Sequence, residues 1–333
     1  MYVLLGLCLA LAALLTLNAL ASACAALVWR AVAPRVARGP AAERSAFLFA
    51  LRVFPPVLAA LLAFALVVPA YTYHEPADSG EVVGTKLALI AAVSAAGVLL
   101  ALWRVARTWL ATRRLARDWT RRAARVEVEG LGLPAYRLRH RFPVIAVIGI
   151  FRPRLFIAEQ VFDALTDGEL AAAVGHERGH VAARDNLKRA LLQAGQDALL
   201  FAPLGRSLLR AWQRESEVAA DEFAAAKGPR AAVDLAAAIV KISRMIPHGA
   251  RPTLPAGAHL LGADEEDGLS QRVRNLLRLA SATGDAPAGV RSRSPLNLAL
   301  GLCLGAACAL LFTHPEVLRV THTAIEQVVA HLR

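Results

Sequence analysis

Gly175-His176-Glu177-Arg178-Gly179-His180 contains the pattern H-E-x-x-H. On a helix, His176 and His180 stand one turn apart on the same face and can share a single metal ion. Glu177 is offset from them by about 100° of helix rotation, where it can reach a water on that metal. The hypothesis that the surrounding sequence has to support is a zinc peptidase.

The residues on either side of this pattern predict a buried helix. Thr166 and Glu169 form a capping box that predicts the start of the helix. Its inward face is small and apolar: Leu170, Ala173, Val174 and Val181. Asp185, five residues after His180, either accepts a hydrogen bond from a ligand histidine or caps the following helix, predicted over residues 186–200.

A second acidic stretch further along the chain offers the missing ligand. A catalytic zinc ion takes three protein ligands and keeps one open position. Glu217 and Asp221 are four residues apart on one helical face, so Glu217 is predicted to bind the metal and Asp221 to accept the remaining N–H of a ligand histidine. Glu215 and Glu222 compete for the ligand role but project to other faces.

Four short segments rich in Val, Ile and Phe precede the helix and predict a small sheet. They are separated by Gly and Pro and cover residues 126–129, 136–142, 144–150 and 154–158. The last segment is interpreted as an edge strand on which a substrate chain lies extended, or as a strand that only packs against the helix.

The composition indicates a membrane protein. The chain has 333 residues, of which 56% are hydrophobic, and a mean hydropathy of +0.46. Four apolar blocks can each cross a hydrocarbon layer of roughly 30 Å; they are residues 3–28, 47–70, 87–103 and 296–312. A cleaved signal peptide is the alternative for the first block, but no Lys or Arg precedes it and it continues past Cys24. Buried helices of a soluble core are the alternative for the last two.

Charge in the connections predicts the orientation. The connection between the first two blocks is basic, with Arg30, Arg35, Arg38 and Arg44, whereas residues 71–84 carry Glu75, Asp78 and Glu81 and no Lys or Arg. We therefore expect the amino terminus outside, residues 104–294 in the cytoplasm and the tail outside. The net charge of +12 is concentrated after the third block, where an interfacial helix on anionic lipid is favoured over nucleic-acid binding.

The predicted fold class is a mostly α integral membrane protein with four transmembrane helices and a cytoplasmic α+β zincin-like (gluzincin) peptidase domain between helices three and four. The predicted segments are a membrane domain (residues 1–103), a basic interfacial helix (104–125), the peptidase domain (126–294), the fourth transmembrane helix (295–313) and an extracytoplasmic tail (314–333). The tail is either a short amphipathic helix or solvated. All four cysteines lie in the apolar blocks, so zinc has to be held by His and carboxylate.

The stretch from His176 to Leu187, the downstream E-x-x-x-D and the upstream Phe151-Arg152-Pro153-Arg154-Leu155-Phe156-Ile157 resemble the BlaR/MecR type of bacterial membrane metallopeptidase. The resemblance implies that His176, His180 and Glu217 bind Zn²⁺ and that Glu177 is the general base. It also implies a bacterial cytoplasmic-membrane protein that cleaves a cytoplasmic repressor, and often itself, after an outside signal. The beta-lactam receptors carry a large sensor after the fourth helix; only residues 314–333 follow it here, so no inducing signal is implied.

Several functional questions stay open at this stage. The alternatives are a quality-control or processing protease like HtpX or the CAAX prenyl protease, favoured if the H-E-x-x-H helix lies within the membrane, and a non-catalytic zinc-binding membrane scaffold. The expected partners are a cytoplasmic protein substrate and the lipid bilayer, without direct nucleic acid; a homo-oligomer is left open. His140, His248 and His259 are weak candidates for the residue that stabilises the reaction intermediate.

Overall fold

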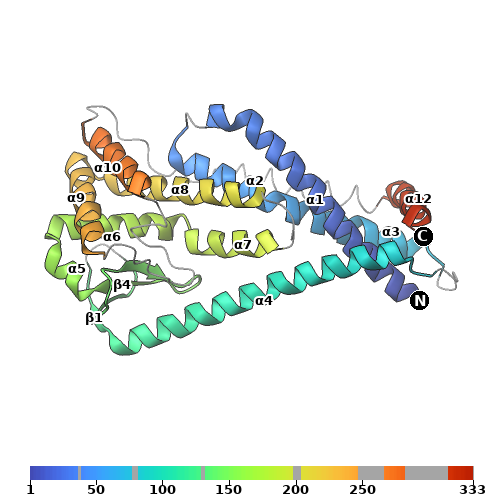
Figure 1. The fold of residues 1–333 in the computed structure, drawn as a ribbon, viewed down its shortest axis with the longest axis horizontal. Coiled ribbons are helices and arrows are strands. Elements are labelled where there is room, and N and C mark those ends of the chain that lie inside the picture. Colours follow the sequence, from blue (N-terminus) through green and yellow to red (C-terminus); the bar gives the residue numbers. More distant parts are fainter. Residues whose placement is uncertain are drawn as a thin grey trace.

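The computed structural model describes residues 1–36, 39–76, 82–128, 132–197, 204–246, 266–281 and 314–332. Three long helices lead to a small sheet surrounded by shorter helices at one end of an elongated molecule (Figure 1). The predicted fourth transmembrane helix, residues 295–313, lies outside the described residues.

Among the described residues, three helices are long and apolar enough to cross a membrane, as the sequence predicted for the first three blocks. They are α1 (Tyr2–Val36), the run from α2 (Ala41–Leu62) through the π-helical turn η1 (Ala63–Val67) to α3 (Val68–His74), and α4 (Thr85–Arg122). Their length and composition indicate a membrane protein.

Helix α4 contains both the third apolar block and most of the basic segment that follows it. The helix has 38 residues, which corresponds to about 57 Å at 1.5 Å per residue. The basic segment is therefore not a separate helix from residue 104, because no residue between Trp103 and Arg122 breaks the helix. It ends where Ala123 is extended and the chain enters the sheet.

The sheet has the order β1-β2-β4-β3, with β1 (Ala124–Val126), β2 (Ala135–Leu138), β3 (Ile145–Ile148) and β4 (Arg154–Ala158). Strand β4 pairs with β2 in parallel and with β3 antiparallel. The interpretation of residues 154–158 as an edge strand is therefore wrong: both edges of β4 are hydrogen-bonded, and β3 is an edge strand beside the H-E-x-x-H helix.

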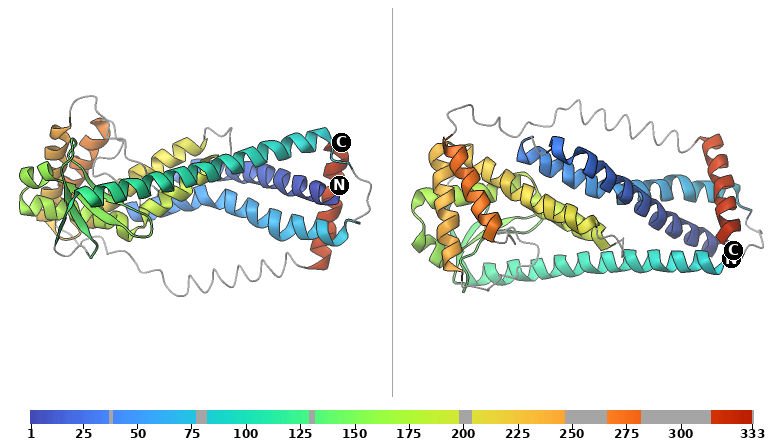
Figure 2. Two further views of the ribbon diagram at one scale, coloured as in Figure 1. Left: turned by 90° about the horizontal axis from the view of Figure 1, so that it is seen from below. Right: turned by 45° about the horizontal axis from the view of Figure 1, so that its top comes forward.

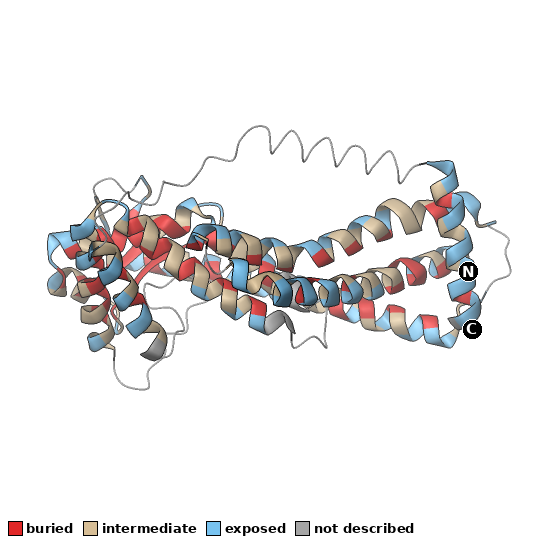
Figure 3. Ribbon diagram, turned by 90° about the horizontal axis from the view of Figure 1, so that it is seen from above, coloured by how far each residue is buried: buried red, intermediate tan, exposed pale blue. Residues whose placement is uncertain are grey.

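The hydrophobic core joins this sheet to the shorter helices around it. Every residue of β3 is buried, and Leu155, Phe156, Ile157 and Ala158 of β4 have no exposed surface. Figure 3 shows buried residues concentrated at this end, while the long helices expose much of their apolar surface. The core packs around α5 (Glu159–Ala164), α6 (Asp167–Ala182), α8 (Leu204–Ala225), α9 (Pro229–Met245) and α10 (Glu266–Ser281).

Two helices connect the end of the molecule that holds the sheet to the long helices. Helix α7 (Asp185–Asp197) packs against α4 and α2, and α8 packs along the amino-terminal half of α2. Their shared apolar cluster contains Leu48 of α2, Leu192 of α7 and the fully buried Trp212 of α8. The helix that carries Glu217 is thereby fixed against an apolar helix as well as against α6.

The tail forms a helix, α12 (Pro315–Leu332), as one of its two interpretations predicted. It crosses the end of the helical bundle opposite the sheet and packs on α3 (Figure 2). Leu318 and Val329 are buried on its inner face, whereas Val320 and Val328 are exposed.

Candidate metal centre

Helix α6 begins as the sequence predicted and carries both histidines into the interior. Thr166 accepts from the backbone N–H of Glu169, and the Glu169 carboxylate accepts from the backbone N–H of Thr166. About two and three turns further on, His176 has no exposed surface and His180 has 2%. Lys241 of α9 lies 2.7 Å from the Glu169 carboxylate and holds this end of α6 against α9.

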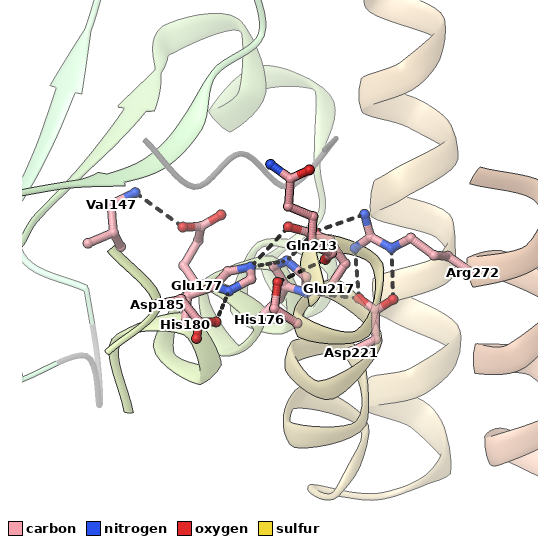
Figure 4. Close-up of polar contacts among 10 residues, drawn as sticks. Val147, His176, Glu177, His180, Asp185, Gln213, Glu217, Asp221 and Arg272 are labelled. Atoms are coloured by element: carbon pink, nitrogen blue, oxygen red, sulfur yellow. Dashed lines mark hydrogen bonds and ion pairs between the residues drawn. The ribbon is translucent and has the colours of Figure 1, made fainter. Parts of the chain in front are cut away.

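Three residues of α6 and α8 direct their donor atoms to one point (Figure 4). The two Nε2 atoms of His176 and His180 lie 3.1 Å apart. Glu217 places Oε2 3.5 Å from His176 Nε2 and Oε1 3.6 Å from His180 Nε2. Ligands at about 2.0–2.1 Å in a tetrahedron lie about 3.3 Å from one another, so the three separations fit a single metal ion with one position left open.

The other nitrogen of each imidazole faces a carboxylate. His176 Nδ1 lies 2.8 Å from Asp221 Oδ1, and His180 Nδ1 lies 2.7 Å from Asp185 Oδ2. These contacts direct the Nε2 lone pairs toward the common point. Of the two interpretations of Asp185, the structure shows the contact with the ligand histidine; Asp185 is the first residue of α7.

Arg272 of α10 completes the site, and the sequence analysis did not identify it. Its Nε and Nη2 each donate to one oxygen of Asp221 at 2.8 Å, and its Nη1 lies 3.3 Å from Glu217 Oε2. Although burial opposes ionisation, this guanidinium holds the pKa of Asp221 below its usual range. Arg272 lies in a basic stretch with other arginines, so the sequence did not distinguish it from its neighbours.

Glu177 is fully buried beside the two histidines and is oriented by the sheet. Its Oε2 accepts from the backbone N–H of Val147 at 3.1 Å, and its Oε1 has no hydrogen-bond partner among the described residues. Burial raises the pKa of Glu177 to about 7. A carboxylate with one anchored oxygen, one free oxygen and a pKa near neutrality is suited to take up and return a proton.

Asn186 joins α7 to the same strand. Its Nδ2 donates to the backbone oxygens of Val147 and Gly149, at 3.0 Å in each case. Together, Glu177 and Asn186 bind both polar backbone groups of Val147, so at this residue the edge of β3 is closed by side chains of the α6–α7 corner. The sequence analysis did not single out Asn186.

The charge of the centre calls for a cation. Four buried carboxylates, those of Glu177, Asp185, Glu217 and Asp221, face two cations, the buried Arg272 and, at the rim, Lys188. Against burial, Glu217 and Asp185 raise the pKa of His180 to about 10. The same negative field that attracts a proton attracts a divalent ion. The residues present therefore fit a bound divalent metal.

The competing carboxylates do not enter the centre. Glu215 pairs with Arg44 of α2 at 2.7 Å, and Glu222 accepts from the backbone N–H of Ala41 at 3.2 Å. His140 is held at the sheet, where its Nδ1 accepts from the backbone N–H of Phe142 and its ring packs on Trp119. His248 and His259 lie outside the described residues.

Two histidines one turn apart on a helix, a glutamate beside the first and a carboxylate from a second helix define a metallopeptidase type of centre. The chain belongs to the BlaR1 peptidase M56 family, whose sequence model matches residues 81–276. The resemblance to the BlaR/MecR type is thus confirmed, and the protein is a membrane metallopeptidase by family. A comparison with curated proteins found no match.

Proposed function

We propose that this protein is a zinc endopeptidase of the bacterial cytoplasmic membrane that cleaves a cytoplasmic protein in transmembrane signalling. The observation that carries the proposal is that His176, His180 and Glu217 bring donor atoms to within 3.1–3.6 Å of one another, close to the edge lengths of a metal tetrahedron, with the unpartnered Oε1 of Glu177 nearby. Two imidazoles and one carboxylate with an open position match the ligand set of catalytic zinc.

His176, His180 and Glu217 would hold the ion. When bound, the ion supplies polarisation of the scissile carbonyl and acidification of a water. Glu177 takes the proton of that water on Oε1 and returns it to the amine that leaves as the peptide bond breaks. Val147 keeps the Glu177 carboxylate oriented through Oε2 during both transfers.

The proposed substrate is a soluble protein, with a transcriptional repressor as the first candidate. The support is the family, together with the position of α6 beside a sheet rather than among the three apolar helices. That position gives no support to the alternative of an HtpX-like or CAAX-type protease with its site inside the membrane.

The substitution Glu177→Gln tests catalysis. We expect cleavage to fall by a factor on the order of 10²–10⁴ or more, because the proton acceptor is removed while the shape of the site is kept. Zinc content per chain stays at the native level, because Glu177 is not one of the proposed ligands. The measurement is a proteomic comparison of cells with the native protein and the variant, together with zinc analysis of both purified proteins.

The matched control is Glu43→Gln, an exposed glutamate in the first turn of α2, which should leave cleavage unchanged. A protein fragment that appears with the native protein and the control but not with Glu177→Gln identifies the substrate. Identical fragment patterns for all three proteins would contradict the peptidase assignment and favour the non-catalytic scaffold.

A further inference from the structure

We propose that Glu75, His322 and Glu326 form a second divalent-metal site, which fastens α12 to the end of α3. This cluster lies at the end of the molecule opposite the sheet, where α12 crosses the helical bundle (Figure 2). It shares no residue with the centre on α6 and α8, and the proposal does not rest on the protein being a peptidase.

The three side chains bring their ligand atoms together from two distant parts of the chain. One atom of each residue, a carboxylate oxygen or an imidazole nitrogen, lies within 4.8 Å of the other two. His322 and Glu326 are four residues apart on one face of α12, and Nε2 of His322 lies 3.7 Å from Oε1 of Glu326. A histidine and a carboxylate at this helical spacing can bind one ion together.

Glu75 is held in place by the chain around it. It follows the last turn of α3, and its backbone N–H donates to the oxygen of Tyr71 at 2.9 Å. Tyr71 in turn donates its hydroxyl to the backbone oxygen of Tyr2 and stacks on the Tyr2 ring. Contacts with α1 and α3 therefore fix the backbone position of Glu75 independently of α12.

The side chains of the cluster lack the partners that would otherwise explain their approach. Among the described residues, neither Glu75 nor Glu326 forms an ion pair with Lys or Arg, so two like charges face one histidine. His322 is 17% exposed, and its Nδ1 is buried without a hydrogen-bond partner. Two adjacent carboxylates repel each other unless a cation or a proton lies between them.

The donor set indicates which ion fits. One imidazole and two carboxylates are borderline and hard ligands, a combination that suits Zn²⁺ or Mn²⁺ better than Ca²⁺, which takes six to eight oxygen ligands. His74 adds a second imidazole at the rim, with its ring centroid 5.5 Å from that of His322. An ion at this position would link the amphipathic helix α12 to the bundle in addition to the apolar contacts of Leu318 and Val329.

Zinc counting on the full chain in detergent tests the site. All proteins carry Glu177→Gln to prevent self-cleavage, and bound zinc is measured after equilibrium dialysis against buffered Zn²⁺. We expect His322→Ala and Glu326→Gln each to lose one zinc ion per chain. His180→Ala, which removes a ligand of the centre on α6, should lose a different ion, and the combination of His180→Ala with His322→Ala should bind none.

The matched control is His331→Ala, on the same helix, where Nδ1 contacts the backbone oxygen of Gln327 at 2.7 Å instead of the cluster; its zinc content should be unchanged. Glu326 is largely exposed, so Glu326→Gln keeps the packing of α12 even if His322→Ala disturbs it. Native zinc content in both His322→Ala and Glu326→Gln would overturn the proposal. Loss of zinc confined to His180→Ala would do the same while leaving the peptidase assignment intact.

Hydrogen exchange tests the fastening of α12 separately. In the His180→Ala protein, which retains only the second site, added Zn²⁺ should slow exchange of the amides of α12. The effect should disappear when Glu326→Gln is added. Equal exchange rates with and without Zn²⁺ would overturn the link between the ion and the docking of α12.

Discussion

At the scale of single residues, the side chain of Asn186 connects α7 to strand β3 of the sheet. It is 9% exposed, and its amide nitrogen is shared between two backbone oxygens of the β3 end. Val147, one of these two residues, is also the residue whose N–H orients Glu177. Asn186 therefore acts on the proposed reaction through the strand, as a positioning residue, without contacting the metal ligands.

We expect Asn186→Ala to reduce cleavage about tenfold, because a strand held less firmly orients Glu177 less well. The free energy of unfolding should fall by about 1–3 kcal/mol, since two buried carbonyl groups lose their donor. Zinc content should stay at the native level. The measurements are substrate cleavage, denaturant unfolding and zinc analysis, with Asn275→Ala on α10 as control, because its side chain accepts a hydrogen bond from the exposed Gln271 of the same helix. Native cleavage by Asn186→Ala would show that the strand does not position Glu177.

At the scale of elements, the distance between α6 and α8 decides whether Glu217 meets the two histidines. Gly179, between the histidines on α6, lies against α8: a Cβ there would be 3.0 Å from the Ala220 Cα and 3.3 Å from the Phe223 Cβ. A Cβ at Gly175, one turn earlier, would meet Ala224 at an ordinary 3.5 Å. The close approach of α6 and α8 therefore requires a glycine at the position of Gly179 but not at that of Gly175.

Gly179→Ala should lower the free energy of unfolding by about 1–3 kcal/mol and weaken zinc binding. The added methyl group would press on the backbone of α8 and move Glu217 away from the two histidines. Gly175→Ala is the matched control: it should be neutral or stabilising by up to about 1 kcal/mol, since Ala favours helix. Denaturant unfolding and zinc titration of the two variants provide the comparison. Equal effects at the two positions would contradict the packing argument.

The cap of α6 predicts a pH dependence of stability. Burial of Glu169 opposes ionisation, but the hydrogen bonds from Lys241 and Thr166 outweigh it and lower the pKa of Glu169 below 4.5. Its contribution is therefore present above pH 4.5 and is lost as the pH falls through the lower pKa of the folded state.

Glu169→Gln keeps an acceptor for the backbone N–H of Thr166 but removes the charge. It should lower the free energy of unfolding by at most about 1 kcal/mol at neutral pH, because Lys241 is 42% exposed and its ion pair is screened. The difference from the native protein should shrink as the pH is lowered below 4.5. Thermal unfolding at a series of pH values measures it. Asp167→Asn, an exposed change in the same turn, serves as control, and a difference that grows on acidification would contradict the assignment.

At the scale of the whole molecule, two chemically different ends are separated by the three apolar helices. The centre on α6 and α8 lies at one end, and the cluster on α3 and α12 lies at the other (Figures 1 and 2). Helix α8 contacts both the histidines and α2, through Glu217 on one face and Glu215 on another. A movement of α2 would therefore reach a metal ligand without passing through the sheet.

The proposed orientation predicts how introduced cysteines react when the four native ones are replaced by Ala. Tyr73→Cys, on an exposed position of α3, should react with a membrane-impermeant maleimide in intact cells. Arg230→Cys, at a side chain that is 95% exposed at the peptidase end, should react only after the membrane is permeabilised. Leu99→Cys, exposed on the apolar part of α4, serves as the lipid-facing control and should react in neither case. The reverse pattern would place the peptidase end outside.

The sequence by itself determined the features that depend on neighbours along the chain. The spacing of His176 and His180, the capping box at Thr166 and the length of the first three apolar blocks follow from helix geometry, which is local. The E-x-x-x-D pattern gave Glu217 and Asp221 for the same reason. The short strands were predicted with boundaries that differ from the observed ones by a few residues. A strand ends where its hydrogen bonds to the neighbouring strand end, and its own composition does not fix that point.

Only the tertiary structure decided which distant groups meet. The choice of Glu217 over Glu215 and Glu222, the arrival of Arg272, the closure of the β3 edge by Asn186 and the approach of Glu75 to His322 all join segments far apart in the chain. Strand β4 was predicted at the edge of the sheet and lies in its interior for the same reason, since the order of a sheet is set by which strands pair. Local sequence patterns do not predict these distances, because the distances depend on how whole helices pack against the sheet and against the helical bundle.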